Sequence, residues 1–171
     1  MTFFLGILSG IIISFINSLV RNCLEKKRLA SAITSEITAL MKQYGKIGGS
    51  LKRNNPDGTC TLFTTKIDDD FFTIYNKNAD KLGYFSPLVI KKIVELYTNA
   101  KGFVCSIKTW NDMVENKFPD NKVSIDEINR YYECLKYQRD GIFTDAMNLT
   151  NELNVLYCNR RFKCYWNLLI K

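Results

Sequence analysis

The sequence contains no histidine, only three prolines among its 171 residues, and no pair of cysteines spaced as C-x-x-C. Without histidine the chain lacks the side chain that most often serves as a general base and as a metal ligand near neutral pH. Phosphate-loop, Rossmann, zinc-protease and nucleophile-elbow motifs are missing as well. We therefore expect no enzymatic activity, no cofactor and no metal ion.

The cysteines do not form a disulfide framework. Such frameworks are typical of short, loop-rich secreted chains, and zinc sites use closely paired ligands. Neither pattern is present, so we expect reduced thiols at buried helical positions, where cysteine acts as a small hydrophobe. The six are Cys23, Cys60, Cys105, Cys134, Cys158 and Cys164.

Acidic residues are outnumbered by basic ones, 17 to 24, which gives a formal net charge of +7. Such an excess is typical of nucleic-acid-binding proteins and also of proteins beside an anionic membrane leaflet. The length suits one modest domain with an appendage. The distribution of charge has to decide between these classes.

Charge is absent from Phe3 to Val20, eighteen residues in which Asn17 is the one strongly polar side chain. As a helix this run is about 27 Å long, close to the hydrocarbon thickness of a bilayer. A signal peptide carries positive charge before its apolar run, and core helices are rarely apolar on every face for so long. We predict a transmembrane helix over residues 1–22.

Basic residues follow this run directly, at Arg21, Lys26, Lys27 and Arg28. Because cytoplasmic flanks carry the excess of lysine and arginine, the N-terminus is predicted outside and residues 23–171 are predicted in the cytoplasm. We expect these four side chains to lie at the membrane surface, in contact with lipids or another anionic partner. A reducing cytoplasm also agrees with free cysteines.

Small residues recur at every fourth position of the apolar run, at Gly6, Gly10, Ser14 and Ser18. This spacing places them along one helix face, where small side chains let a second membrane helix approach closely. The pattern predicts a homo-oligomer or a partner membrane protein packed on that face. The alternative is that glycine and serine are simply common in membrane spans.

Beyond the apolar run, hydrophobic residues recur at helical spacing. The first stripe, which includes Leu29, Ile33 and Ile37, continues from the membrane run with no helix breaker before Gly45. A later stripe includes Leu88 and Ile93. The predicted fold is all-α, an N-terminal transmembrane helix continuing into an antiparallel cytoplasmic bundle of about four helices. These helices cover roughly 24–44, 69–81, 87–116 and 125–168, with a loop over 45–60.

Several residues indicate where these helices begin. Ser86 followed by Pro87 is typical of a helix start, and Ser124 with Glu127 forms a predicted capping box. Consecutive side chains on a helix point about 100° apart, so Asp68–Asp70 are predicted to cap a helix rather than bind a metal. A break in the last helix at Asp140–Gly141 is left open.

The C-terminal segment mixes cations with aromatic rings. Three interpretations stay open: a solvated helix face, a membrane-surface anchor, and a site for single-stranded nucleic acid. An antiparallel bundle would return this segment toward the membrane, which favours the anchor over nucleic acid. The residues concerned include Arg160, Arg161, Lys163 and Trp166.

The segment "FFTIYNKNADKLGYFSPLVIKKIVELY", Phe71–Tyr97, combines an aromatic-rich short helix, a Lys-Leu-Gly turn and a Ser-Pro helix start. In this layout the chain loosely resembles small single-pass membrane proteins of bacteria and prophages. The resemblance implies an N-terminal membrane helix, a helical cytoplasmic domain and an inner-membrane location, and it assigns no catalytic residue.

The expected function is that of a membrane-anchored, non-enzymatic interaction or scaffold protein that oligomerises through its membrane helix. An alternative is a membrane effector of phage defence or superinfection exclusion, gated by a ligand or partner on the cytoplasmic domain. A nucleic-acid tether using Lys52–Arg53 and Arg160–Arg161 is a third hypothesis.

Overall fold

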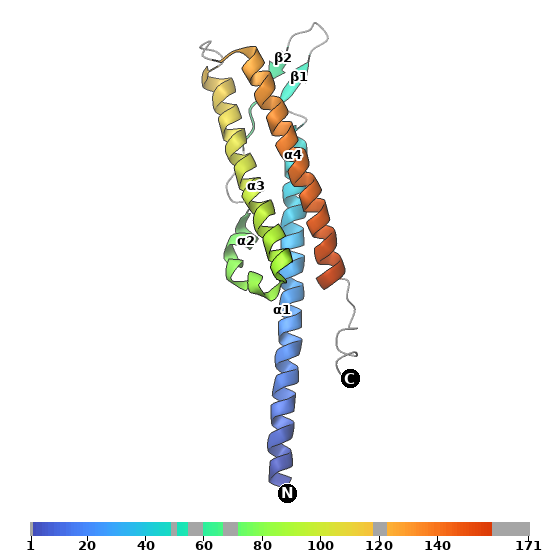
Figure 1. The fold of residues 1–171 in the computed structure, drawn as a ribbon. Coiled ribbons are helices and arrows are strands. Elements are labelled where there is room, and N and C mark those ends of the chain that lie inside the picture. Colours follow the sequence, from blue (N-terminus) through green and yellow to red (C-terminus); the bar gives the residue numbers. More distant parts are fainter. Residues whose placement is uncertain (1, 49–50, 55–59, 67–71, 118–122, 159–171) are drawn as a thin grey trace.

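A computed structural model describes residues 2–48, 51–54, 60–66, 72–117 and 123–158. Three long helices lie side by side, and one of them extends far beyond one end of the bundle (Figure 1). Of the described residues 88% are helical, so the all-α prediction is confirmed. The long helices are α1 (Thr2–Gly48), α3 (Pro87–Asp112) and α4 (Ile125–Leu153).

Helix α1 is continuous over 47 residues, or about 70 Å. The predicted helix over 24–44 is its second part, and Gly45 does not end it, because the helix continues to Gly48. The predicted stripe is buried in the bundle: Leu29 is 6%, Ile33 0% and Ile37 1% exposed. One helix therefore supplies both a wall of the core and the projecting segment.

Part of the predicted loop over 45–60 is a short antiparallel hairpin. Strands β1 (Lys52–Asn54) and β2 (Cys60–Leu62) pair with Lys52 opposite Leu62. The chain after β2 is held to α3, since the Trp110 indole N–H donates to the carbonyl of Phe63 at 2.9 Å. Two strands this short gain their stability from such contacts rather than from the ladder alone.

The predicted helix over 69–81 is instead two shorter elements, α2 (Thr73–Lys77) and the 3-10 segment η2 (Ala79–Tyr84). The predicted caps Asp68–Asp70 lie outside the described residues. The carboxylate at the start of α2 comes from α1: Glu36 accepts the backbone N–H groups of Ile74 at 2.6 Å and Tyr75 at 3.1 Å.

Glu36 is a buried carboxylate, 8% exposed, that also accepts the hydroxyl of Tyr97 at 2.5 Å. The Tyr97 ring stacks on Tyr75 with centroids 4.2 Å apart. Burial, and next the bond to Glu36, raise the pKa of Tyr97 well above that of free tyrosine. Three donors therefore stabilise one carboxylate, which ties α1, α2 and α3 together.

The predicted helix starts are confirmed in part. Ser124 and Glu127 form the predicted capping box, which is confirmed. Ser86 occupies the N-cap of α3, but its side chain makes no capping hydrogen bond. Helix α4 passes through Asp140–Gly141 without a break.

Two π-helical segments extend the long helices, η3 (Met113–Lys117) after α3 and η4 (Asn154–Cys158) after α4. The predicted third helix, 87–116, thus corresponds to α3 with most of η3. The predicted fourth helix, 125–168, is helical through residue 158, and its remainder lies outside the described residues.

The cysteine prediction is wrong about burial. Cys23, Cys105 and Cys134 are exposed, and Cys60 and Cys158 are half-buried. All five are free thiols in the structure, and Cys164 lies outside the described residues. Cys105 and Cys134 each adjoin a buried position of their helix, at Val104 and Leu135, but fall one residue off the apolar stripe.

Two threonine hydroxyls inside the bundle, on Thr34 and Thr150, have no hydrogen-bond partner among the described residues. Replacing either by valine keeps the shape and removes an unsatisfied group, so each variant should be more stable by about 1 kcal/mol. Urea unfolding followed by circular dichroism measures this. The control is Thr38→Val, an exposed site whose hydroxyl bonds the Thr34 carbonyl. Lower stability of the valine variants would contradict the prediction.

The buried tyrosines predict a loss of stability in alkali. Burial raises the pKa of Tyr44 as it does that of Tyr97, so the folded chain keeps protons that the unfolded chain releases above about pH 10. Stability should be unaffected by these groups below that pH. Above it, stability should fall by up to about 1.4 kcal/mol per pH unit for each tyrosine. Across this range the free energy of unfolding should depend less on pH in Tyr97→Phe than in the wild type. Tyr137→Phe is the control, because Tyr137 is 84% exposed.

Candidate functional site

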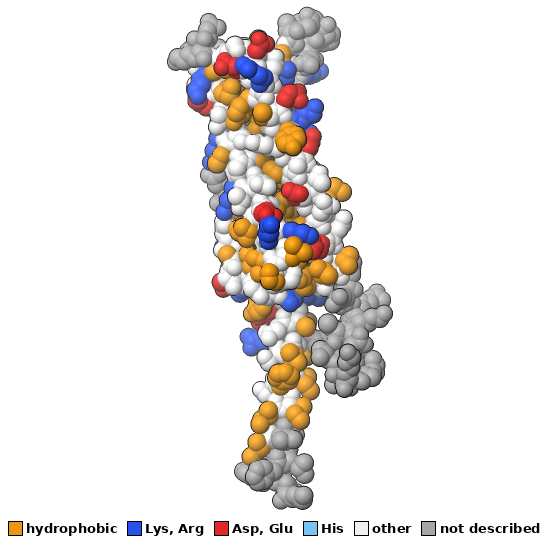
Figure 2. Space-filling model, viewed as in Figure 1, with side chains coloured by type: hydrophobic (Ala, Val, Ile, Leu, Met, Phe, Trp, Pro, Cys, Tyr) orange, Lys and Arg blue, Asp and Glu red, His pale blue; other side chains and the backbone are white. Residues whose placement is uncertain are grey.

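From Gly10 to Leu19 the projecting part of α1 has no covered face. Every residue from Gly10 to Leu19 is exposed, and burial in the core begins only at Leu29. Figure 2 shows the contrast: on the face in view, blue and red atoms lie on the wide body and at its neck, and the narrow part below carries orange and white. Large apolar side chains are exposed here, with Ile11 62%, Ile13 58% and Phe15 64% exposed.

Within the part of the chain whose side chains are described, no helix is both long and apolar enough to cross a membrane. The side chains of residues 1–6, 8 and 9 are outside that description.

The predicted small-residue face lies on this projecting segment. Gly10, Ser14 and Ser18 are all exposed, and the side-chain position of Gly6 lies outside the described residues. A methyl group added at Gly10 would meet nothing within 4 Å. The bundle of the same chain therefore leaves these three positions accessible to another molecule.

Of the predicted basic residues, Arg21 and Lys26 make contacts within the chain. Arg21 pairs with Glu25 at 3.3 Å, with 82% of its own side chain exposed. Lys26 lies over the ring of Tyr157 in η4, 5.4 Å from its centroid, in cation–π geometry. Lys27 and Arg28 are exposed and form no ion pair with any residue that the structure describes.

The base of the projecting segment is fixed to the bundle by two contacts. Glu25 accepts the hydroxyl of Tyr84 at 3.1 Å. This bond, and next the Arg21 guanidinium, lower the pKa of Glu25. In addition, Lys26 lies over the ring of Tyr157, which itself packs against Phe85 with ring centroids 5.0 Å apart. The direction of the projecting segment is therefore set by the bundle and not by a free hinge.

Apolar side chains stand exposed around the same point. Leu24 is 47% exposed in α1, Leu88 60% at the start of α3, and Val155 64% in η4. Because Phe85 contacts Tyr157, and Lys92 pairs with Glu152 at 2.6 Å, the start of α3 and the end of α4 lie together. We call Leu24, Lys27, Arg28, Leu88 and Val155 the neck surface.

Sequence reasoning identified the cations of the neck surface and missed its apolar members. Leu88 was predicted to lie in the core stripe of its helix, and this is wrong: Val89, one residue on, is buried at 1% exposure. The helical pattern alone left the phase of this first turn ambiguous, since Leu88, Val89 and Ile90 are all apolar.

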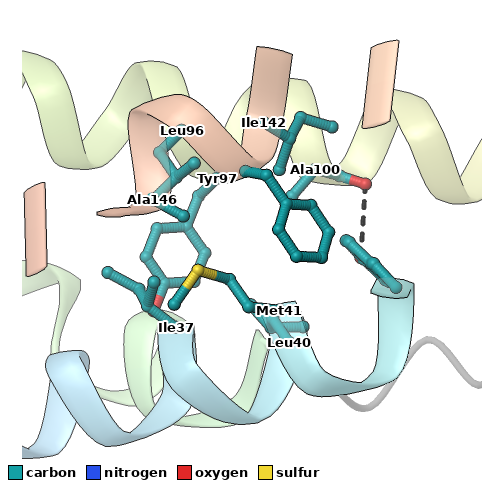
Figure 3. Close-up of a pocket in the computed structure, with 10 residues that line it drawn as sticks. Ile37, Leu40, Met41, Leu96, Tyr97, Ala100, Ile142 and Ala146 are labelled. Carbon is teal, nitrogen blue, oxygen red and sulfur yellow. Dashed lines mark hydrogen bonds between the residues drawn. The ribbon is translucent and has the colours of Figure 1, made fainter. Parts of the chain in front are cut away.

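The bundle interior offers no room for a ligand at the point drawn in Figure 3. There α1, α3 and α4 meet around a cavity of about 10 Å³ with apolar walls, no larger than a single water requires. The Tyr44 hydroxyl at its edge donates to the Ala100 carbonyl at 3.5 Å. This cavity is a packing space of the core.

A more open hollow of about 290 Å³ lies between α3 and α4. Its charged side chains are Lys92, Glu95 and Asp145, of which Lys92 already pairs with Glu152. An effector gated by an anionic ligand would need a basic pocket, and this hollow does not provide one. Among the described residues there is also no group of three or more potential metal ligands.

Of the basic residues of the nucleic-acid hypothesis, the structure describes Lys52 and Arg53. Lys52 donates to the side chain of Asn129 at 2.6 Å and lies 5.6 Å from the ring centroid of Tyr132. Arg160, Arg161, Lys163 and Trp166 lie outside the described residues.

Comparison of the chain with protein-family models, with curated proteins and with solved structures finds no match. The resemblance to small bacterial and prophage membrane proteins therefore stays a prediction, and the function has to be argued from the site alone.

Proposed function

We propose that the chain is a single-pass membrane protein whose helical bundle works as a non-enzymatic interaction or scaffold module. The observation that carries this proposal is the projecting part of α1, whose apolar side chains are exposed on all sides from Gly10 to Leu19. Exposed apolar surface of this extent is costly in water. The uncharged run in which it lies, Phe3–Val20, has the length of a bilayer core.

The cations at the neck give the orientation. Arg21, Lys26, Lys27 and Arg28 follow the apolar run, and Glu25 is the only acidic residue among them. The positive-inside tendency then places the bundle in the cytoplasm of a bacterial cell and the N-terminus outside.

The native cysteines allow this topology to be tested without introducing new cysteines. Cys105 and Cys134 are exposed on the bundle, so a membrane-impermeant maleimide should label them only after spheroplasts are permeabilised. The chain should also stay in the membrane pellet at alkaline pH. A matched Cys105→Ser/Cys134→Ser variant identifies the labelled sites. Release from the pellet would overturn the anchor, and labelling in intact spheroplasts would overturn the orientation.

Self-association through the small-residue face is the finer part of the proposal. Gly10→Ile/Ser14→Ile should weaken association of the full chain by about fivefold or more, because bulky side chains keep helix backbones apart. Single-molecule photobleaching in lipid measures the oligomer. The bundle should fold unchanged, since space around Gly10 is open.

The matched control enlarges the opposite side of the helix with Ile12→Phe/Ile16→Phe. These positions lie about 160° around the helix from Gly10 and Ser14. If both double variants lose association equally, self-association does not depend on the small-residue face. If the wild type and both double variants are all monomeric, the membrane helix is a simple anchor.

A further inference from the structure

The members of the neck surface that belong to α1 and α3 point toward the side from which the projecting segment of α1 leaves, because both helices begin on that side. Side chains on a helix point back toward its N-terminus, and the N-terminus of α3 lies at this end of the bundle (Figure 1). Leu88, the second residue of α3, therefore extends away from the body of the bundle, and 60% of it is exposed.

The level of this end along α1 is fixed by a hydrogen bond. Glu25, which holds Tyr84, lies five residues after Val20, or about 7.5 Å along the helix. The headgroup layer on each side of a bilayer core is about 5–7 Å thick. If Val20 ends the apolar span, the start of α3 lies at the outer edge of the lipid headgroup layer.

The chemistry of the neck surface is that of a peripheral membrane contact. Lys27 and Arg28 are exposed without a described ion-pair partner, and Leu24, Leu88 and Val155 are exposed aliphatic groups at the same end of the bundle. Cations that meet lipid phosphates next to aliphatic groups that enter the acyl boundary are the combination found on interfacial protein surfaces.

We propose that the neck surface docks on the anionic phospholipids of the leaflet that α1 crosses, so that the bundle rests on the membrane instead of standing free above it. This inference rests on the proposed membrane anchor. The proposed partner is the bilayer itself, because α1 brings it to this end of the bundle and its headgroup charge is complementary to Lys27 and Arg28.

Hydrogen exchange of the full chain in nanodiscs tests this docking. Amides of residues 84–92 should exchange about tenfold more slowly in discs containing phosphatidylglycerol than in discs of phosphatidylcholine alone. Lys27→Gln/Arg28→Gln should abolish the difference, because each cation near an anionic surface contributes about a fivefold preference. Lys42→Gln/Lys136→Gln, which removes two cations farther along the bundle, should keep it.

Leu88→Ser tests the aliphatic part. It should speed exchange of residues 84–92 in anionic discs, whereas Val94→Ser, at a position 39% exposed in the same helix, should leave it unchanged. Equal exchange in both lipids, or no effect of either neck variant, overturns the docking while the anchor stands. A chain that does not enter the discs overturns the anchor and the docking with it.

Discussion

Ile11→Arg/Ile12→Arg is expected to release the chain from the membrane. Both side chains are exposed, 62% and 51%, and they lie at the centre of the uncharged run Phe3–Val20. An arginine at the middle of a membrane helix costs about 2.5–3.5 kcal/mol, so the pair should cost about 5–7 kcal/mol. Isoleucines contribute only about 0.3–0.6 kcal/mol each, and the remaining residues cannot offset such a cost. Membrane fractionation and alkaline extraction measure the outcome.

The matched control places the same charges on the bundle. Val94 is 39% and Met147 57% exposed, so Val94→Arg/Met147→Arg should leave the chain in the membrane pellet. If Ile11→Arg/Ile12→Arg also stays there after alkaline extraction, the projecting helix is not what holds the chain at the membrane. If it becomes soluble with the circular dichroism of a folded bundle, the span and the bundle are separable, as the exposure of residues 10–19 indicates.

Glu36→Ala should be the most destabilising single substitution proposed for the bundle. It leaves three donors without their acceptor: the N–H groups of Ile74 and Tyr75, and the hydroxyl of Tyr97. Each buried group left unpaired costs about 1–3 kcal/mol, so a loss of about 3 kcal/mol or more is expected. Urea unfolding followed by fluorescence measures it, with Trp110 as a fully buried reporter.

Two further variants make the Glu36 result specific. Glu95→Ala removes an exposed carboxylate whose partner Lys91 lies at 3.7 Å, and it should change stability by less than about 0.5 kcal/mol. Adding Tyr97→Phe to Glu36→Ala should cost less than the two single losses together, because the two side chains share a hydrogen bond. Additive losses would mean that Glu36 acts on α2 alone.

The sequence by itself determined the features that depend on local pattern. The helical class, the stripe from Leu29 to Tyr44 and the capping box at Ser124 follow from spacings within one turn or a few turns of helix. The uncharged run Phe3–Val20 and its basic flank are equally local, and so the hypothesis of a membrane span needs no structure.

Tertiary structure decided whatever depends on residues distant in the chain. Glu36 caps a helix that begins 37 residues later at Thr73, and no local pattern marks a carboxylate in α1 as its partner. The hairpin β1–β2 falls in a stretch rich in turn residues, and the contacts of the following segment with α3 come from Trp110 and Asn111. The neck surface arises because antiparallel packing brings the start of α3 and the end of α4 beside the base of the projecting helix. Sequence periodicity selects which side of a helix is apolar, but only packing decides which apolar side chains, Leu88 among them, remain uncovered.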